Sequence, residues 1–443
     1  MFSKILIANR GEIAVRIIRA CKEMGIFTVA VFSTADKDAL HVSLADESVC
    51  IGSPKAQDSY LNKAAILSAA MVTGAQAIHP GYGLLSENAE FAELCKQCNI
   101  TFIGPSSKVI EKMGDKDMAR KTMKAAGVPI IEGSEVVDTL NNAIDLAIKI
   151  GFPLLIKARS GGGGKGIRLV TNLSEFESAF HAAKQEAEKS FNDSGVYLEK
   201  YLYPVKHIEM QLLCDSFGNC VCLGERECSI QRKNQKLIEE SPSYLMDEKT
   251  REKMIEVTQK AALAAGYENA GTIEFLYCND GSFYFMEMNT RLQVEHTVTE
   301  MVSGIDIVKW QLRIAAGQKL SFSQEDVVIK GSAIECRICA EDPENNFTPS
   351  CGKIDFLHVP GGPNVRFDTA LYQGYHIPPF YDSMIGKLVV YAATREETIR
   401  KMQAALCELI VDGVKTNKEL QMEILSDPRF KKGDYGTDFM ENK

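Results

Sequence analysis

Residues 283–296 read Phe-Tyr-Phe-Met-Glu-Met-Asn-Thr-Arg-Leu-Gln-Val-Glu-His, and apolar and polar side chains alternate along most of this stretch. A period of two predicts a β-strand, because successive side chains of a strand point to opposite faces. One face would carry a polar series: Glu287, Asn289, Arg291, Gln293 and Glu295. This series is too polar for a core, so it predicts either a water-exposed sheet face or the wall of a site.

A second β-rich run, residues 272–277, precedes this strand, and Asn-Asp-Gly-Ser at 279–282 is a hairpin signal between the two. With Asp-Gly at the centre of the turn, Glu274 lies directly opposite Glu287. Facing carboxylates repel each other unless a cation lies between them. Together with the amide of Asn289 they form an all-oxygen ligand set that suits Mg²⁺ or Mn²⁺. The hairpin therefore predicts either a polar sheet face or a divalent metal site.

The composition is that of a globular protein of several domains. A length of 443 residues predicts about three domains of roughly 150 residues each. The hydrophobic share of 45% and the charged share of 25% are ordinary for such proteins. A net charge of −9 argues against non-specific binding to nucleic acid or to an anionic membrane. We expect any site for a polyanion to be local.

Several sequence features favour a cytoplasmic chain. The longest weakly polar stretch, residues 64–78, is shorter than the roughly 20 apolar residues of a membrane span. Met1 is followed almost at once by the apolar run 5–8, which leaves no room for a signal or transit peptide. The thirteen cysteines are expected as thiols. Two C-x-x-C pairs, 95/98 and 336/339, fall in a helical pattern and in a strand pattern, so neither predicts zinc binding or redox chemistry.

Residues 4–113 alternate strand and helix patterns, which predicts a parallel sheet with crossover helices. Asn-Arg-Gly-Glu at 9–12 follows the first strand but lacks G-x-G-x-x-G, so a nicotinamide enzyme is not expected. Tyr82 lies between two glycines in His-Pro-Gly-Tyr-Gly, residues 79–83. This segment is either an ordinary turn or a place where a ligand approaches the backbone closely.

A lysine and a glycine-rich loop suggest an anion site. Lys116 lies in the first turn of a predicted helix over 115–126, where its charge opposes the helix dipole. It is either a solvated lysine or one with an anion partner. Two predicted strands, 154–158 and 167–170, flank the glycine-rich loop 159–166. Backbone amides of such a loop can wrap phosphate oxygens, although a flexible linker is the alternative. Because the loop joins two strands and has Gly166 at the Ser/Thr position, it is not a Walker A loop.

The remaining segments extend this pattern. Residues 196–202 predict a strand leading into a loop, which suits recognition of an adenine edge. The next strand places His207, Glu209 and Gln211 on one face, and residues 225–236 form either a solvated loop or the wall of an anion site. From about residue 331 a third, mixed α/β unit begins with a strand on which Glu335 and Arg337 share a face.

The glycine loop between strands, the preceding lysine, the following Glu-Lys pair and the carboxylate hairpin together resemble the ATP-grasp fold. Three longer motifs are similar to those of biotin carboxylases: HPGYGLLSEN at 79–88, MNTRLQVEH at 288–296 and YDSMIGK at 381–387. The resemblance covers essentially the whole chain. It implies an α/β (α+β) fold with a Rossmann-like parallel-sheet domain at 1–113, an ATP-grasp domain at 114–330 and a mixed α/β domain at 331–443. A mobile glycine-rich lid would span about 131–203.

The family that the chain resembles uses ATP to phosphorylate bicarbonate to carboxyphosphate and then carboxylates a ureido nitrogen of biotin. The resemblance implies two Mg²⁺ or Mn²⁺ ions, held by Glu274, Glu287 and Asn289. It implies that ATP is bound by Lys116, Lys157, Gly161, Gly162, Gly163, Gly164, Lys165, Gly166, Glu199, Lys200, Leu202, His207 and Gln231.

The resemblance also implies the groups that bind the reactants. Bicarbonate would be positioned by Lys236, Arg291, Gln293 and the Val294 backbone. Glu295 would be the general base, and Arg337 would stabilise the biotin enolate. Tyr82 and Gly83 would lie near the biotin ring. Both reactants become anionic, so cations must offset charge that develops in the transition state.

Two positions depart from the family pattern. Asn234 stands where the family usually has histidine, which weakens any ribose or phosphate role there. Lys165 replaces a common arginine, so the charge is kept but the planar guanidinium fork is lost.

The sequence lacks an Ala-Met-Lys-Met biotin-attachment hairpin, since Met123-Lys124 lies in a helical pattern. We therefore expect biotin on a separate carrier protein, with a carboxyltransferase as a further partner. The chain's end soon after the third unit favours a free-standing homodimeric subunit. Acetyl-CoA carboxylase is the default by analogy, with pyruvate or another acyl-CoA carboxylase as the alternative. A different ATP-grasp carboxylate–amine ligase and a non-catalytic nucleotide sensor are the competing hypotheses.

Overall fold

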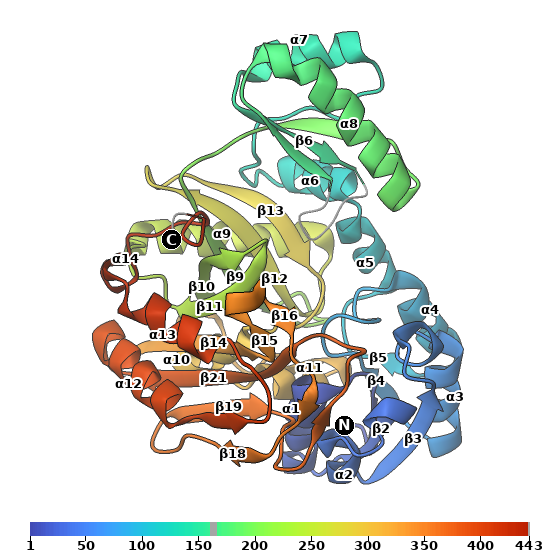
Figure 1. Ribbon diagram of the computed structural model, residues 1–443. Coiled ribbons are helices and arrows are strands. Elements are labelled where there is room, and N and C mark those ends of the chain that lie inside the picture. Colours follow the sequence, from blue (N-terminus) through green and yellow to red (C-terminus); the bar gives the residue numbers. More distant parts are fainter. Residues whose placement is uncertain (160–165, 442–443) are drawn as a thin grey trace.

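The computed structural model describes residues 1–159 and 166–441, and it divides visibly into a base and a projecting lid (Figure 1). The sequence-predicted contacts at Gly161, Gly162, Gly163, Gly164 and Lys165 lie outside the described residues. Among the described residues no helix is long and apolar enough to cross a membrane. The cysteines, all of which the structure describes, are free thiols.

The N-terminal part is a parallel sheet with strand order β3-β2-β1-β4-β5, as the alternating pattern predicts. Its strands are β1 (Lys4–Ile7), β2 (Phe27–Ser33), β3 (Glu47–Gly52), β4 (Ala77–His79) and β5 (Thr101–Phe102). Its helices are α1 (Gly11–Glu23), α2 (Leu40–Leu44), α3 (Lys63–Thr73), α4 (Ala89–Gln97) and α5 (Ser107–Gly114). Ile5, Leu6 and Ile7 are fully buried, because helices cover both faces of the central strand.

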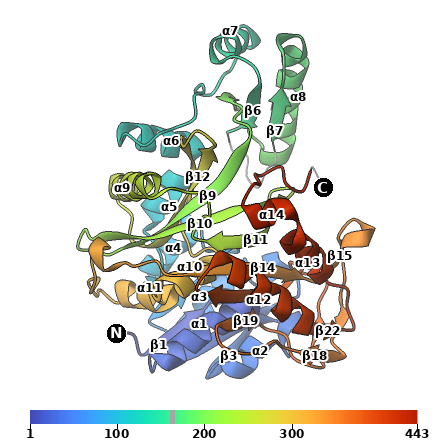
Figure 2. The ribbon, with the colours of Figure 1, turned by 90° about the vertical axis from the view of Figure 1, so that its left-hand side faces the viewer.

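A large antiparallel sheet runs through the rest of the base, in the order β13-β12-β9-β10-β11-β14-β21-β19. Figure 2 shows its long strands β9 and β10 crossing beneath the lid. The strands are β9 (Val205–Cys214), β10 (Cys220–Arg232), β11 (Gln235–Ser241), β12 (Asn269–Cys278), β13 (Phe283–Asn289), β14 (Ser332–Cys339), β19 (Val365–Thr369) and β21 (Met384–Ala392). Because β11 pairs with β14, one sheet joins the ATP-grasp part to the C-terminal part.

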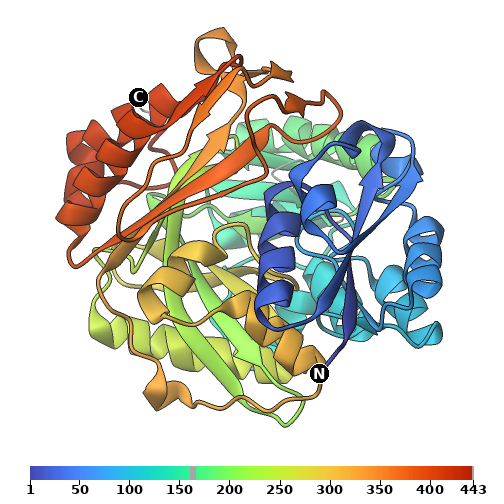
Figure 3. The same cartoon turned by 90° about the horizontal axis from the view of Figure 1, so that it is seen from below.

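Helices cover this sheet and bring the N-terminal part against it. They are α9 (Glu248–Ala265), α10 (His296–Ser303), α11 (Ile307–Ala315), α12 (Arg395–Glu408), α13 (Lys418–Ser426) and α14 (Pro428–Lys432). Short strand pairs complete the C-terminal part: β15 (Glu341–Asp342) with β16 (Thr348–Pro349), β17 (Gly352–Lys353) with β20 (His376–Ile377), and β18 (Phe356–His358) with β22 (Ile410–Asp412). Seen from below, α1 lies beside the C-terminal strands, and it contacts β19 and β21 (Figure 3).

The lid has its own sheet and its own core. Strands β6 (Leu154–Ala158), β7 (Ile167–Val170) and β8 (Val196–Lys200) form an antiparallel sheet in the order β7-β6-β8. Helices α7 (Leu140–Ile150) and α8 (Leu173–Phe191) pack on it, and α6 (Lys116–Ala125) lies where the lid meets the base (Figure 1). Phe176 and Phe180 stack in the core of the lid, with their ring centroids 6.1 Å apart.

The strand predicted over residues 283–296 is confirmed in its first half and wrong in its second half. Strand β13 ends at Asn289, residues 290–295 form a loop, and α10 begins at His296. The N–H of Thr290 donates to Glu87 Oε1 at 3.1 Å instead of continuing the ladder. A carboxylate from the N-terminal part thus ends the strand, and no sequence period reveals such a long-range contact.

The predicted pairing of Glu274 with Glu287 is confirmed, although the turn differs from the prediction. Near the turn Tyr277 pairs with Phe283 and Phe275 with Phe285, a register one residue away from the predicted one. A bulge between Phe275 and Glu274 shifts the register back, so the two glutamates face each other.

Residues 225–236 are not a solvated loop. They form most of β10 and the start of β11, and Glu225, Arg226 and Glu227 are buried. The guanidinium of Arg226 compensates its burial by donating to Glu209, to Gln211 Oε1 at 2.7 Å and to Thr299 Oγ1 at 2.9 Å. Charge density alone predicts exposure, whereas paired charges can be buried.

We predict that Phe180→Ala loosens the lid without loosening the base. Phe180 is 1% exposed, so truncation should destabilise the lid by about 3–5 kcal/mol. Amide hydrogen exchange in β6 and β8 should accelerate, while exchange in β1 and β2 stays unchanged. Phe217→Ala, at a side chain 61% exposed, is the control and should change stability by about 0.5 kcal/mol at most. Equal acceleration in β1 would show that the lid does not unfold as a separate unit.

Candidate active site

Lys236 lies at the centre of a buried cluster of charges. From β11 its ammonium donates to Glu295 Oε1 at 2.5 Å, Glu209 Oε2 at 2.6 Å and Glu274 Oε1 at 3.1 Å. Burial would lower the pKa of Lys236, but the three carboxylates raise it well above its usual value. The lysine is therefore charged and joins β9, β12 and the start of α10. Glu209 completes this set, although the sequence marked it only as a face-sharing neighbour of His207.

Glu295 is 1% exposed and bridges two cations. Its Oε1 accepts from Lys236, and its Oε2 accepts from Arg337 Nη2 at 3.0 Å. Burial would raise the pKa of Glu295, yet Lys236 and Arg337 hold it well below its usual range. Glu295 is therefore ionised, which is the state that a general base needs before it accepts a proton.

Arg337 is itself positioned by Glu239, a residue that the sequence reasoning missed. Arg337 Nε on β14 donates to Glu239 Oε1 on β11 at 2.6 Å. Burial raises the pKa of Glu239 to about 7, although Arg337 opposes the shift. The sequence feature that could have drawn attention to Glu239 is the pair of glutamates that follows the apolar Leu237-Ile238. The continuous sheet thus places Lys236 and Arg337 on adjacent strands.

The predicted metal ligands meet at one place. Glu274 and Glu287 face each other across β12 and β13, and Asn289 Nδ2 donates to Glu274 Oε1 at 2.9 Å. Glu287 is exposed to solvent, so its oxygens are open to a ligand. Carboxylates that would otherwise repel each other form a donor set that fits Mg²⁺ or Mn²⁺.

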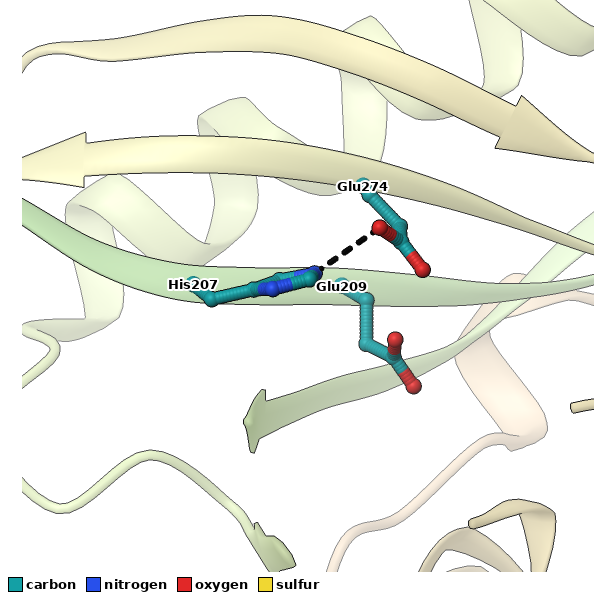
Figure 4. A group of neighbouring side chains, drawn as sticks. All are labelled: His207, Glu209 and Glu274. Carbon is teal, nitrogen blue, oxygen red and sulfur yellow. Dashed lines mark ion pairs between the residues drawn. The ribbon is translucent and has the colours of Figure 1, made fainter. Parts of the chain in front are cut away.

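His207, Glu209 and Glu274 project from β9 and β12 towards the same space (Figure 4). Each residue offers one ligand atom, and these atoms lie within 4.8 Å of one another. His207 Nε2 is 2.9 Å from Glu274 Oε2, and His207 Nδ1 is 2.7 Å from Gln231 Nε2. The predicted neighbours His207 and Gln231 therefore meet beside the predicted metal ligands.

Arg291 and Gln293 extend the cluster from the loop after β13. Arg291 donates to Gln293 Oε1 at 2.7 Å and to Asn289 Oδ1 at 3.0 Å. Gln293 Nε2 donates to Glu274 Oε1 at 2.8 Å. Glu87 accepts from Arg291 Nε at 2.9 Å, a role that the sequence analysis did not predict. These contacts connect the polar series although it does not lie on one strand.

Two lysines and an arginine face the lid end of the site. Lys157 forms an ion pair with Glu199, and Arg120 Nη1, which the sequence reasoning missed, donates to Glu199 Oε2 at 2.7 Å. Lys116 makes no hydrogen bond or ion pair with any residue that the structure describes. Burial and the neighbouring Lys157 lower the pKa of Lys116, while Glu287 and Glu199 counteract this shift. An ammonium in such surroundings suits an anionic ligand.

The remaining predicted nucleotide contacts occupy the root of the lid. Lys200 Nζ donates to the carbonyls of Ile150 and Gly151 at 3.4 and 3.3 Å, and Leu202 is half-buried. Gly166 has a φ of +74°, and a Cβ there would lie 2.8 Å from the Cβ of Ala158. Glycine is thus required where the loop rejoins β7.

Asn234 occupies the tip of the hairpin between β10 and β11. Lys233 and Asn234 have φ values of +48° and +63°, and Arg232 pairs with Gln235. Asparagine is among the residues that tolerate such left-handed turns. Asn234 is exposed, and the left-handed backbone conformation of the turn accounts for an asparagine at this position.

The turn that contains Tyr82 is held by Asn9, at the end of β1. Asn9 Nδ2 donates to the carbonyls of Pro80 and Tyr82 at 2.7 and 2.8 Å. Gly83 has a φ of +62° and open space where a Cβ would point. The hydroxyl of Tyr82 donates to Glu12 of α1. This turn is therefore a rigid part of the N-terminal domain.

Comparisons with known proteins agree along the whole chain. Family models match at residues 1–110 (biotin carboxylase, N-terminal domain), 115–323 (carbamoyl-phosphate synthase L chain, ATP binding domain) and 335–442 (biotin carboxylase C-terminal domain). Biotin carboxylase 1 of Bacillus subtilis is 54% identical over 100% of this chain and 98% of its own length.

Two solved structures extend this agreement. The biotin carboxylase–β,γ-ATP complex of Campylobacter jejuni has a TM-score of 0.97 and 50% identity, covering 100% of this chain and 99% of that one. The biotin carboxylase domain dimer of Hydrogenobacter thermophilus 2-oxoglutarate carboxylase has a TM-score of 0.95 and 49% identity, covering 100% and 98%. The chain belongs to the biotin carboxylase family of ATP-dependent ligases.

Proposed function

We propose that this chain catalyses the first half-reaction of a biotin-dependent carboxylase, using bicarbonate and ATP to carboxylate biotin through carboxyphosphate. The observation that carries the proposal is the bridge Lys236–Glu295–Arg337, which places an ionised carboxylate between two cations beside the metal ligands. Such a site can remove a proton and then stabilise the anion that forms.

In the proposed reaction, Glu295 takes the proton of bicarbonate, and a bicarbonate oxygen forms a bond to the γ-phosphorus of ATP as ADP leaves. Lys236, Arg291, Gln293 and the Val294 backbone hold the bicarbonate. Lys116, Lys157 and the loop over 161–166 bind the phosphates. Glu274, Glu287 and Asn289 would hold the two divalent ions, which supply positive charge against the phosphate oxygens.

Biotin would then receive the carboxyl group on the Arg337 side of Glu295. The bond between the carboxyl carbon and the phosphorus-bound oxygen of carboxyphosphate breaks, phosphate leaves and takes the proton of the ureido nitrogen, and that nitrogen forms the new bond to the carboxyl carbon. The guanidinium of Arg337 offsets the negative charge of the enolate, and Tyr82 and Gly83 lie near the ring. Two related structures support this ligand set. The Campylobacter protein carries an ATP analogue, and the Hydrogenobacter domain dimer carries MgADP and bicarbonate. We propose that this chain likewise binds ATP, a divalent metal ion and bicarbonate, and that it forms a homodimer.

We further propose that biotin arrives on a separate carrier protein in the cytosol and that acetyl-CoA carboxylase is the parent complex. Met123-Lys124, the nearest resemblance to a biotin-attachment motif, lies in α6 with Met123 fully buried. Free thiols throughout the chain suit a reducing compartment. The match to a domain of a 2-oxoglutarate carboxylase makes a keto-acid carboxylase the second candidate.

ATP hydrolysis with and without bicarbonate and biotin tests this function. We expect turnover to require bicarbonate and to rise with biotin, with label from bicarbonate appearing in carboxybiotin. Turnover indifferent to biotin would favour another ATP-grasp ligase, and no turnover would favour a nucleotide sensor. Comparing carrier domains of acetyl-CoA and keto-acid carboxylases as substrates then separates the two candidate complexes.

Glu295→Gln should abolish most turnover while keeping nucleotide binding. The amide cannot accept the proton, so we expect kcat to fall by about 10²- to 10⁴-fold. Calorimetric titration with ATP should give a dissociation constant close to that of the wild type. Glu325→Gln, at an exposed carboxylate in the loop before β14, is the control. A wild-type rate for Glu295→Gln would remove Glu295 as the base.

Glu287→Gln should raise the metal requirement. Loss of one carboxylate ligand should increase the Mg²⁺ concentration for half-maximal turnover by at least about tenfold. A Mg²⁺ or Mn²⁺ titration of the initial rate measures this change. Glu256→Gln removes a carboxylate from the exposed side of α9, where it pairs with Lys260, and should leave the titration unchanged. Identical curves for Glu287→Gln and wild type would exclude Glu287 as a ligand.

A further inference from the structure

Lys387 is a fully buried lysine at the centre of the polar face of the large sheet. It lies on β21, directly opposite Arg337 of β14 and Asp368 of β19, and it is 0% exposed. A buried ammonium is costly unless it is paired and hydrogen-bonded. Its partners therefore indicate what this lysine does. The sequence reasoning included it only as the last residue of the motif at 381–387.

The ammonium of Lys387 contacts two other parts of the chain. It donates to the carbonyl oxygen of Val294 at 2.7 Å, and it lies 3.3 Å from Glu12 Oε1. Val294 belongs to the loop that carries Glu295, whereas Glu12 belongs to α1 of the N-terminal domain. One buried cation on the C-terminal strands thus joins all three parts of the molecule.

The contact with Val294 acts directly on the residue that follows it. The carbonyl of Val294 and the N–H of Glu295 belong to one planar peptide group, so holding the first fixes the second. The side chain of Glu295 is fixed by Lys236 and Arg337. Lys387 supplies the matching restraint on its backbone, which lies in a loop outside any strand ladder.

The contact with Glu12 acts on the turn that contains Tyr82. Glu12 Oε1 is near Lys387 and also accepts from the Tyr82 hydroxyl, whereas Glu12 Oε2 has no hydrogen-bond partner among residues 1–159 and 166–441. The ring of Tyr82 lies 5.8 Å from the ammonium. Without Lys387, Glu12 would be a buried carboxylate with one hydroxyl donor, and the position of Tyr82 would depend on that bond.

We propose that Lys387 is a positioning residue that aligns the Glu295 peptide with the Tyr82 turn, and so aligns the base with the biotin side of the site. This inference rests on the proposed roles of Glu295 and Tyr82. Lys387 contacts neither reactant and acts through Val294 and Glu12. A small displacement of the reacting groups lowers the catalytic rate strongly, because the rate depends steeply on their alignment.

Lys387→Met tests the proposal, since methionine fills the space but removes the charge and the donors. We expect kcat for carboxylation of free biotin to fall by about 10- to 100-fold. The KM for biotin should rise, while the KM for ATP stays within about twofold of the wild-type value. Lys387→Arg, which keeps charge and donors, should lose less activity than Lys387→Met.

Lys206→Met is the matched control for the loss of a buried lysine. Lys206 on β9 is also buried and donates to Glu227 Oε1 at 2.6 Å and to the Gly433 carbonyl at 3.0 Å. Both variants are assayed at a temperature where circular dichroism shows them folded. We expect Lys206→Met to lower Tm yet keep kcat and the KM for biotin within about twofold of wild type.

Two outcomes would overturn the inference. Wild-type values of kcat and of the KM for biotin in Lys387→Met would show that the lysine does not align the site. An equal loss in Lys206→Met would indicate a general effect of destabilisation. Failure of the proposed function is distinguishable, because the wild-type enzyme would then carboxylate no biotin. Failure of this inference leaves the wild type active and the Lys387 variants equal to it or to the control.

Discussion

The structure of the active site depends on one ammonium group that contacts three carboxylates. Lys236 holds Glu209, Glu274 and Glu295 within hydrogen-bond distance, and these residues come from β9, β12 and the start of α10. Without Lys236, the remaining cations Arg226 and Arg337 would face three buried carboxylates, whose mutual repulsion would favour uptake of a proton. The lysine therefore keeps a metal-ligand candidate and a base candidate ionised in the same small volume.

The charges around this lysine are arranged in order across the sheet. The predicted metal ligands lie on β12 and β13, the predicted base Glu295 follows β13, and Arg337 and Lys387 lie on β14 and β21. Each cation is held by a carboxylate from a neighbouring element, as Arg337 is by Glu239 and Arg291 by Glu87. Such fixed charges need little reorganisation when an anionic substrate gains charge, which is how preorganised sites lower a barrier.

Local sequence patterns predicted the parts of the molecule that local chemistry determines. The parallel sheet, the strands at 154–158 and 167–170, and the pairing of Glu274 with Glu287 all match the structure. The end of β13 could not be predicted, because it depends on Glu87, about 200 residues away along the chain. Glu239, Arg120 and Glu12 were missed for the same reason, since each one's partner is brought near only by the fold. The roles in catalysis were carried by the resemblance and remain predictions.

The continuous antiparallel sheet has a consequence for how this enzyme can be divided. Strand β14 pairs with β11 from Ile238 to Ser241, and it supplies Arg337, which donates to Glu239. A chain ending before Ser332 would leave β11 as an open sheet edge, with unpaired backbone groups able to recruit another strand. The C-terminal part thus completes the sheet beside Lys236 and also supplies Arg337, a partner of Glu295. An insertion into the chain between β11 and β14 would have to preserve the pairing of these two strands.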